Sequence, residues 1–236
     1  MKKDLTELVF ILDKSGSMGG LERDTIGGYN AMLEKQRAQE GECRITTVLF
    51  ADSCELLHDR IDIRAVSPIT DNEYSVGGST ALFDAIGTAI RKICGVQKHT
   101  EKEYRADKVM FVIITDGEEN ASREYTAEKI RAQISRQKEQ FGWEFVFLGA
   151  NIDAVSAAGK VGISADRAAD YLADGEGTRL NFEVMSAAVS EFRSAAKLSE
   201  RHLERIRSDA GARGGQKANR KPGIFRALRQ GPGTRR

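Results

Sequence analysis

The strongest constraint on the fold is a set of short, almost entirely apolar runs that alternate with segments of helical periodicity. The runs Leu8–Leu12, Lys108–Thr115 and Glu144–Leu148 are too short for typical helices and are bounded by charged or turn residues, which is typical of strands buried on both faces. Such strands occur in parallel sheets that are covered by helices on either side. We therefore expect an α/β protein with a three-layer, Rossmann-like sandwich.

The remaining segments extend this alternation of strands and helices. Arg44–Phe50 and Glu55–Ile63 have strand character, and only Ala51–Cys54 separates them, which favours an antiparallel hairpin. This hairpin would place one antiparallel edge strand on an otherwise mostly parallel central sheet. The pattern also predicts helices over Leu21–Gln39, Ala81–Ile93, Tyr125–Phe141, Ala154–Gly159 and Leu180–Arg207, and a short edge strand near Tyr171.

Length and charge distribution predict one large domain followed by a basic tail. The chain has 236 residues, of which 40% are hydrophobic and 30% are charged, enough to build a full core. The net charge is +1, yet residues 211–236 contain eight Lys or Arg and no Asp or Glu, so the preceding 210 residues carry a net charge of −7. We expect a globular domain over residues 1–208 and a disordered, basic, Gly- and Arg-rich tail over residues 209–236.

Cysteine usage and hydropathy indicate a cytoplasmic protein. The three cysteines, Cys43, Cys54 and Cys94, are odd in number and widely spaced, which favours free, partly buried thiols over disulfides or a zinc site. The first apolar run ends in Asp13 and is too short for the core of a secretion signal. The sequence also lacks a run of the roughly twenty apolar residues that cross a bilayer, so we expect no membrane association.

Oxygen-bearing side chains gather at predicted strand ends and helix starts. Asp13 ends the first buried strand, with Ser15 and Ser17 at alternate positions after it, while Asp116 follows the most apolar strand and Thr80 begins a helix after two glycines. In open α/β sheets, ligands bind beyond the carboxyl ends of the strands. Together these residues would supply five oxygens and two formal negative charges, a set that suits Mg²⁺ or Mn²⁺ better than Ca²⁺.

The same residues also have ordinary structural interpretations. Asp13 and Ser15 could be helix N-caps, and Asp116 with Gly117 could form a simple turn. Thr80 could cap its helix and bind a metal at the same time. The segment that follows, residues 118–120 (EEN), could tune or gate the site, or could form a solvated loop and helix start.

Three segments resemble the metal-ion-dependent adhesion site of the von Willebrand factor type A (vWA) domain family. They are DKSGS at 13–17, GGSTAL at 77–82 and ITDGEEN at 114–120, and the resemblance extends from about Leu5 to Phe192. The wider pattern is more similar to the stand-alone bacterial and phage members than to the animal adhesion domains. The resemblance implies direct metal contact for Ser15, Ser17 and Thr80, and a direct or water-mediated role for Asp13 and Asp116.

The resemblance also implies a function. In this family an Asp or Glu of a partner protein completes the coordination shell of the metal. We therefore expect a Mg²⁺-dependent protein-binding module, not an enzyme, that captures an acidic residue of a protein partner within a multi-protein assembly.

Two alternatives come from other functional classes. A metal-dependent phosphohydrolase would resemble DxDxT at the first strand end, but Ser15 replaces the second Asp and so removes the acid–base residue that this chemistry requires. A nucleic-acid-associated protein could act through the positive charges of residues 211–236, which would add salt-dependent phosphate contacts. That tail contains no aromatic interleaving that suggests base recognition, and it could equally serve as a solubilising or partner-docking segment.

Overall fold

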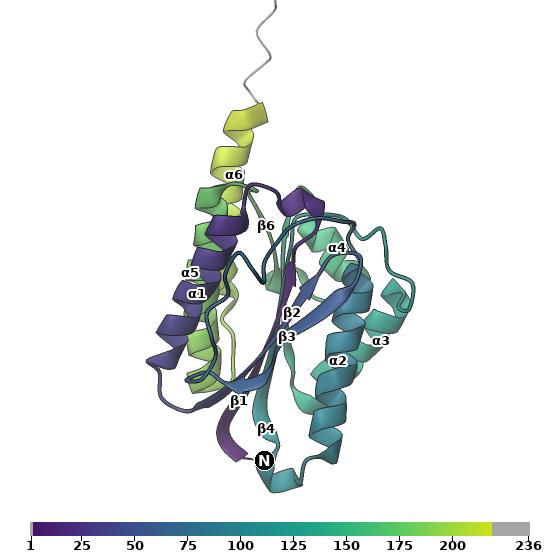
Figure 1. The fold of residues 1–236 in the computed structure, drawn as a ribbon, viewed down its shortest axis with the longest axis vertical. Coiled ribbons are helices and arrows are strands. Elements are labelled where there is room, and N and C mark those ends of the chain that lie inside the picture. Colours follow the sequence, from purple (N-terminus) through teal and green to yellow (C-terminus); the bar gives the residue numbers. More distant parts are fainter. Residues whose placement is uncertain (1, 219–236) are drawn as a thin grey trace, which may run out of the picture.

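The computed structural model describes residues 2–218, which form a twisted six-stranded sheet between two layers of helices (Figure 1). The strand order is β3-β2-β1-β4-β5-β6, so that β1 and β4 lie at the centre. This arrangement confirms the predicted three-layer α/β sandwich. The strands are β1 (Lys2–Asp13), β2 (Glu42–Phe50), β3 (Cys54–Asp62), β4 (Ala106–Thr115), β5 (Glu144–Ala150) and β6 (Ala168–Tyr171).

The sheet is parallel except at one edge, which confirms the predicted antiparallel hairpin. β3 pairs antiparallel with β2, while β1 pairs parallel with both β2 and β4. The register places Leu12 of β1 opposite Ile114 of β4 and Asp13 opposite Phe50 of β2. The carboxyl ends of the two central strands therefore lie side by side at one edge of the sheet.

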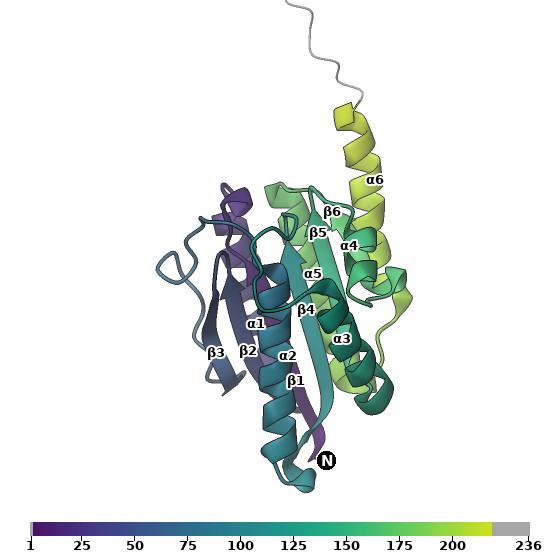
Figure 2. The ribbon, with the colours of Figure 1, turned by 90° about the vertical axis from the view of Figure 1, so that its right-hand side faces the viewer.

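Helices cover both faces of the sheet (Figures 1 and 2). α1, α5 and α6 pack on one face, and α2, α3 and α4 pack on the other, because each helix turns its apolar stripe towards the strands. Short 3₁₀ turns occur at Gly16–Met18, Lys102–Tyr104, Ala165–Arg167 and Glu200–Leu203. The helices are α1 (Glu22–Arg37), α2 (Leu82–His99), α3 (Ala127–Phe141), α4 (Ala154–Lys160), α5 (Gly175–Ala195) and α6 (Glu204–Ala218).

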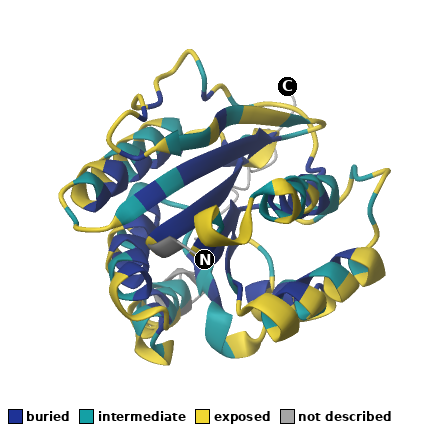
Figure 3. Cartoon of the chain, turned by 90° about the horizontal axis from the view of Figure 1, so that it is seen from below, coloured by how far each residue is buried: buried dark blue, intermediate teal, exposed yellow. Residues whose placement is uncertain are grey.

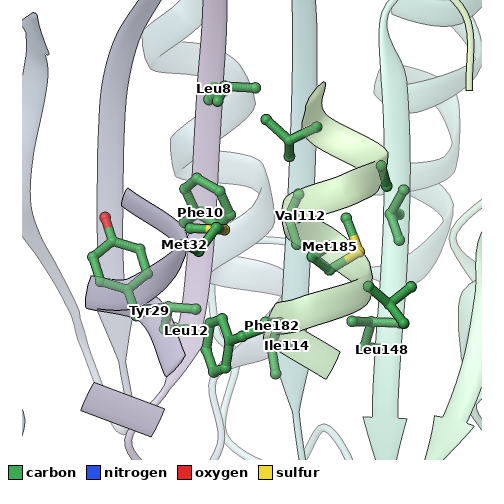
Figure 4. Packing of buried hydrophobic residues seen from close by; sticks show 14 of the residues in the cluster. Leu8, Phe10, Leu12, Tyr29, Met32, Val112, Ile114, Leu148, Phe182 and Met185 are labelled. Carbon is green, nitrogen blue, oxygen red and sulfur yellow. The ribbon is translucent and has the colours of Figure 1, made fainter. Parts of the chain in front are cut away.

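Two apolar cores hold the layers together. The central strands are buried over residues 5–13 and 108–115, whereas the outer faces of the helices are exposed (Figure 3). On the α1/α5 side, Tyr29 makes edge-to-face contacts with Phe10 and Phe182, with ring centroids 5.5 and 6.4 Å apart (Figure 4). On the opposite side, Phe111 stacks on Trp143 and Phe145 with centroids 5.6 and 4.9 Å apart.

The predicted single helix over Leu180–Arg207 is wrong. α5 ends at Ala195, and Ala196 adopts a left-handed conformation with φ 54° that stops the helix. The chain then turns through residues 197–203 and enters α6. The apolar spacing continues across this break because Leu198, Leu203 and Ile206 remain buried in the same core.

Helical structure also passes the predicted domain boundary at residue 208. α6 continues to Ala218, so the disorder predicted for residues 209–218 is wrong. The rest of the predicted tail, residues 219–236, lies outside the described residues. The division into a domain over 1–208 and a basic tail over 209–236 otherwise stays a prediction.

The three cysteines and His58 are buried or half-buried. Cys43, Cys54 and Cys94 are free thiols and are buried or half-buried, as predicted. His58 is buried with 5% exposure, and its ring Nδ1 lies 2.9 Å from the Thr47 hydroxyl. Among the helices within residues 2–218, none has the length and apolar character that crossing a bilayer requires.

Candidate metal centre

The structure brings the five predicted site residues together at the carboxyl edge of the sheet. Asp13 ends β1 and Asp116 directly follows β4, so the parallel pairing of these strands sets the two carboxyl groups at the same edge of the sheet. Ser15 and Ser17 lie in the loop after β1, around the short 3₁₀ turn. Thr80 comes from the loop that leads into α2.

Asp13 is fixed by the backbone and by a neighbouring strand. Its Oδ1 accepts the Ser15 amide at 2.7 Å, and its Oδ2 accepts the Thr115 hydroxyl at 2.6 Å. The Tyr74 hydroxyl donates to the Asp13 main-chain carbonyl from behind the site. With 1% exposure and both carboxylate oxygens hydrogen-bonded, Asp13 is a buried, well-positioned carboxyl group and not the N-cap of a helix.

The two serine hydroxyls form a pair beside the aspartates. Ser15 Oγ and Ser17 Oγ lie 3.0 Å apart, with Ser15 buried and Ser17 exposed. Ser15 precedes the 3₁₀ turn, but its side chain makes no capping hydrogen bond. The side chain of Ser15 therefore does not cap a helix. Its hydroxyl is directed at the Ser17 hydroxyl instead.

Gly117 marks where the three loops meet. A Cβ atom at this position would lie 3.1 Å from Ser17 Oγ and 3.2 Å from Thr80 Oγ1. The hydroxyls of two different loops therefore approach the space that a side chain would occupy in a third loop. Glycine allows this approach, since a side chain would push the hydroxyls away.

Asp116 differs from Asp13 in lacking partners. It is 1% exposed, and neither of its carboxylate oxygens has a hydrogen-bond partner within the described residues. Burial raises the pKa of Asp116; the nearby Ser17 hydroxyl lowers this pKa and the charge of Asp13 raises it. Buried carboxylate oxygens without partners are costly, and a bound cation would satisfy them.

The main chain of Thr80 is clamped by the loop that follows Asp116, a feature that the sequence reasoning missed. Asn120 Oδ1 accepts the Thr80 amide at 2.9 Å, while the Asn120 and Ala121 amides donate to the Thr80 carbonyl at 3.0 and 3.2 Å. Glu119 accepts the amides of Phe83 and Ser122 at 2.8 and 2.7 Å. Asn120 and Glu119 therefore anchor this partly exposed loop to the start of α2.

Backbone contacts also lock the serine loop to the threonine loop. The Gly16 amide donates to the Gly78 carbonyl at 3.1 Å, and the Gly77 amide donates to the Lys14 carbonyl at 2.9 Å. Gly78 has φ +79°, a left-handed conformation that favours glycine. The GG pair before Ser79 thus shapes the crevice and adds no ligand of its own.

The donor set fits a hard cation. Among residues 2–218, no three or more His, Cys, Asp or Glu side chains cluster as a metal site, so any metal here would depend on hydroxyl oxygens and two carboxylates. The adjacent cation, Lys14, is directed to Glu55 at 2.6 Å and does not neutralise the crevice. All-oxygen donors of this kind suit Mg²⁺ or Mn²⁺.

The chain matches a known protein family over most of its length. The model of the von Willebrand factor type A domain matches residues 7–186, which include all five site residues. The chain belongs to the von Willebrand factor type A domain family. No curated protein matches the chain.

Solved vWA structures share the fold at low sequence identity. Proximal thread matrix protein 1 from the mussel byssus is 15% identical, with a TM-score of 0.53 over 79% of this chain and 46% of that chain. A second structure of that protein, with a zinc-occupied metal-ion-dependent adhesion site, has the same identity and TM-score over 78% of this chain and 46% of that one. A vWA protein from Catenulispora acidiphila is 16% identical, with a TM-score of 0.52 over 78% of this chain and 42% of that chain. The present chain thus matches less than half the length of each of these proteins.

Proposed function

We propose that this vWA domain is a divalent-metal-dependent protein-interaction module. Asp13, Ser15, Ser17, Thr80 and Asp116 would hold Mg²⁺ or Mn²⁺, and a partner protein would supply an Asp or Glu to the metal. The observation that carries the proposal is the pair of buried, unpartnered carboxylate oxygens of Asp116 beside the Ser15–Ser17 hydroxyl pair.

The charge and number of donors support an open coordination position. Mg²⁺ takes about six oxygen ligands in octahedral geometry and tolerates few carboxylates. The site offers five side chains, two of them charged, so a bound divalent cation would be neutralised in formal terms but not saturated. When bound, the metal supplies an electrophilic centre that accepts an external carboxylate oxygen. The membership of the vWA family and the zinc-occupied adhesion site of the mussel protein are consistent with this role.

The surroundings of the serines favour binding over hydrolysis. A nucleophilic serine needs a base within hydrogen-bond reach. Ser15 and Ser17 bond to each other, while the three histidines bond elsewhere: His58 to Thr47, His99 to the Gly95 carbonyl and His202 to Glu191. None of the three histidines within residues 2–218 therefore hydrogen-bonds to Ser15 or Ser17 as a base that could activate it.

Thermal melting with and without metal tests the site. We expect Mg²⁺ or Mn²⁺ to raise the melting temperature of the protein relative to EDTA, because a ligand that binds only the folded state stabilises it. Asp13→Ala should abolish this shift. Asp71→Ala, which removes an exposed carboxylate of the loop before Thr80, serves as the matched control and should retain it. A metal-induced shift that persists in Asp13→Ala would overturn the proposed site.

A peptide array tests the partner chemistry. Acidic peptides should bind the Mg²⁺-loaded protein, lose binding in EDTA, and lose binding when their single Glu is replaced by Gln. Binding that is equal for the Glu and Gln peptides, or unchanged by EDTA, would refute capture of a carboxylate by the metal while leaving the metal site itself intact.

A further inference from the structure

A recess at the opposite end of the sheet from the metal centre has features of a second binding site. It has a volume of about 710 Å³ and lies at the start of β4 and just before β5, between the carboxyl ends of α2 and α3. Ligand pockets for small molecules span about 300–1,000 Å³. The recess therefore has room for a small organic molecule, in a region that the family's metal site does not use.

The floor of the recess is apolar and aromatic. Val109 and Trp143 are buried with 3% and 5% exposure, and the Trp143 ring is held flat against Phe111. Phe141 lies at the rim with 57% exposure. A planar ring or short apolar group could lie against these side chains and gain from leaving water.

The walls of the recess carry an excess of positive charge. Lys98, Lys102, Arg105 and Arg136 line it together with one carboxylate, that of Asp107. Within residues 2–218, none of these four cations takes part in an ion pair, in contrast to Lys14, Arg60 and Lys92, which pair with Glu55, Glu7 and Asp59.

The two arginines contact neutral oxygens only. Arg105 Nε donates to the Thr100 carbonyl at 2.8 Å, and Arg136 Nε donates to Gln140 Oε1 at 3.3 Å. These bonds orient the guanidinium groups without pairing them with a carboxylate. Guanidinium groups recognise carboxylate, sulfonate and phosphate oxygens through paired hydrogen bonds.

We propose that this recess binds a small organic anion that carries an aromatic or other planar apolar group. The apolar part lies on Val109, Trp143 and Phe141, and the anionic group faces the cations of the walls. The basic segment 219–236 of the same chain is not a matching occupant, because its charge has the same sign as the walls. This proposal is independent of the metal-dependent function and places no requirement on it.

The chain offers a built-in reporter for the test, because Trp143 is its single tryptophan. The probe is 1-anilinonaphthalene-8-sulfonate, a planar aromatic anion, and the comparison is N-phenyl-1-naphthylamine, its uncharged analogue. The full chain is titrated with each probe while the emission of Trp143 is followed. We expect saturable quenching of Trp143 by energy transfer to the anionic probe, with affinity at least about tenfold higher than that of the neutral analogue.

Charge reversal localises the site. Lys98 and Lys102 are exposed, so the variant Lys98→Glu/Lys102→Glu should fold normally. Its affinity for the anionic probe should be about tenfold lower than that of the wild type. Arg64→Glu/Lys197→Glu changes the net charge equally at two exposed positions away from the recess and should keep the affinity within about twofold. If Lys98→Glu/Lys102→Glu melts at a lower temperature than Arg64→Glu/Lys197→Glu, then Lys98→Gln/Lys102→Gln replaces it. The expected loss of affinity for the anionic probe is then smaller.

Four results would overturn the proposal. These are equal affinity for both probes, equal behaviour of the two charge-reversal variants, binding without a response of Trp143, and a Trp143 signal that depends on protein concentration alone. The last result would assign this face to a second copy of the chain.

Discussion

The two ends of the central strand pair each bury an acidic side chain, and they treat it in opposite ways. At the amino end, Glu7 of β1 is 0% exposed and pairs with Arg60 of β3, whose Nε lies 2.9 Å from Glu7 Oε2. At the carboxyl end, Asp116 is 1% exposed, and both of its carboxylate oxygens lack a partner within residues 2–218. The protein supplies its own cation at one end and none at the other.

The two environments shift the pKa values for different reasons. Burial raises the pKa of Glu7, and the charge of Arg60 partly offsets that effect. Burial also raises the pKa of Asp116, but here the neighbouring charge of Asp13 adds to the increase instead of opposing it. The fold thus pairs Glu7 with a cation of its own, although Glu7 Oε1 lacks a hydrogen-bond partner within residues 2–218, whereas Asp116 has no protein cation and both of its carboxylate oxygens lack partners.

The largest expected effect on stability comes from removing the buried ion pair between Arg60 and Glu7. Arg60→Met should lower the free energy of unfolding by about 3 kcal/mol, because it leaves the buried charge of Glu7 without its partner. The loss should be the same in EDTA and in Mg²⁺, as measured by urea unfolding. The control is Lys92→Met, which removes a more exposed ion pair with Asp59 and should cost at most about 1 kcal/mol. A loss for Arg60→Met that depends on Mg²⁺ would contradict the separation of the two ends.

A pH series sharpens the same comparison. Since the folded-state pKa of Glu7 is raised above its ordinary value of 4.5, its protonated form favours folding. The contribution is fully present below about pH 4.5 and is lost as the pH rises through the folded-state pKa. The stability of the wild type relative to Glu7→Gln should therefore fall with increasing pH, by up to about 1.4 kcal/mol per pH unit. A difference that stays constant or increases with pH would disprove this assignment.

The smallest expected effect concerns the clamp on Thr80. Asn120→Ala removes one hydrogen bond to the Thr80 amide and should cost about 1 kcal/mol of stability. It should also weaken Mg²⁺ binding in calorimetry by up to about tenfold, because the threonine hydroxyl is less well placed.

Asn30→Ala is the matched control for the clamp. Asn30 makes a similar pair of bonds with the main chain of Ile69, both at 2.9 Å. Its loss removes two side-chain hydrogen bonds, so it should destabilise the fold at least as much as Asn120→Ala while leaving Mg²⁺ affinity unchanged. Equal losses of affinity in the two variants would show that Asn120 has no specific positioning role.

Much of this architecture could be predicted from the sequence because it depends on local patterns. The apolar runs at Leu8–Leu12 and Lys108–Thr115 specified buried parallel strands, and the short connection before Glu55 specified the antiparallel edge. The convergence of Asp13 and Asp116 followed from the rule that parallel strands end at the same edge of a sheet.

The features that were missed depend on tertiary contacts. The end of α5 lies at Ala196, which has none of the sequence features of a helix stop, and the apolar spacing continues past it. The hydrogen bonds of Asn120 to Thr80 join positions 40 residues apart. The amide side chain directly after two acidic residues was the available signal, but its partner could not be inferred without the fold. The recess around Trp143 likewise combines side chains from α2, α3, β4 and the 3₁₀ turn at Lys102–Tyr104.

The central claim is that the carboxyl end of the sheet is incomplete without a cation, and Asp116→Asn tests it most directly. The variant keeps the shape of the side chain and removes its charge. In EDTA we expect it to be more stable than the wild type by about 1 kcal/mol in urea unfolding, because a buried carboxylate without partners disfavours the folded state. In saturating Mg²⁺ the order should reverse, since only the wild type gains the full stabilisation of about 2.7 kcal/mol expected at a hundredfold excess over the dissociation constant. A variant that is less stable than the wild type in EDTA, or that gains as much from Mg²⁺ as the wild type does, would contradict the account.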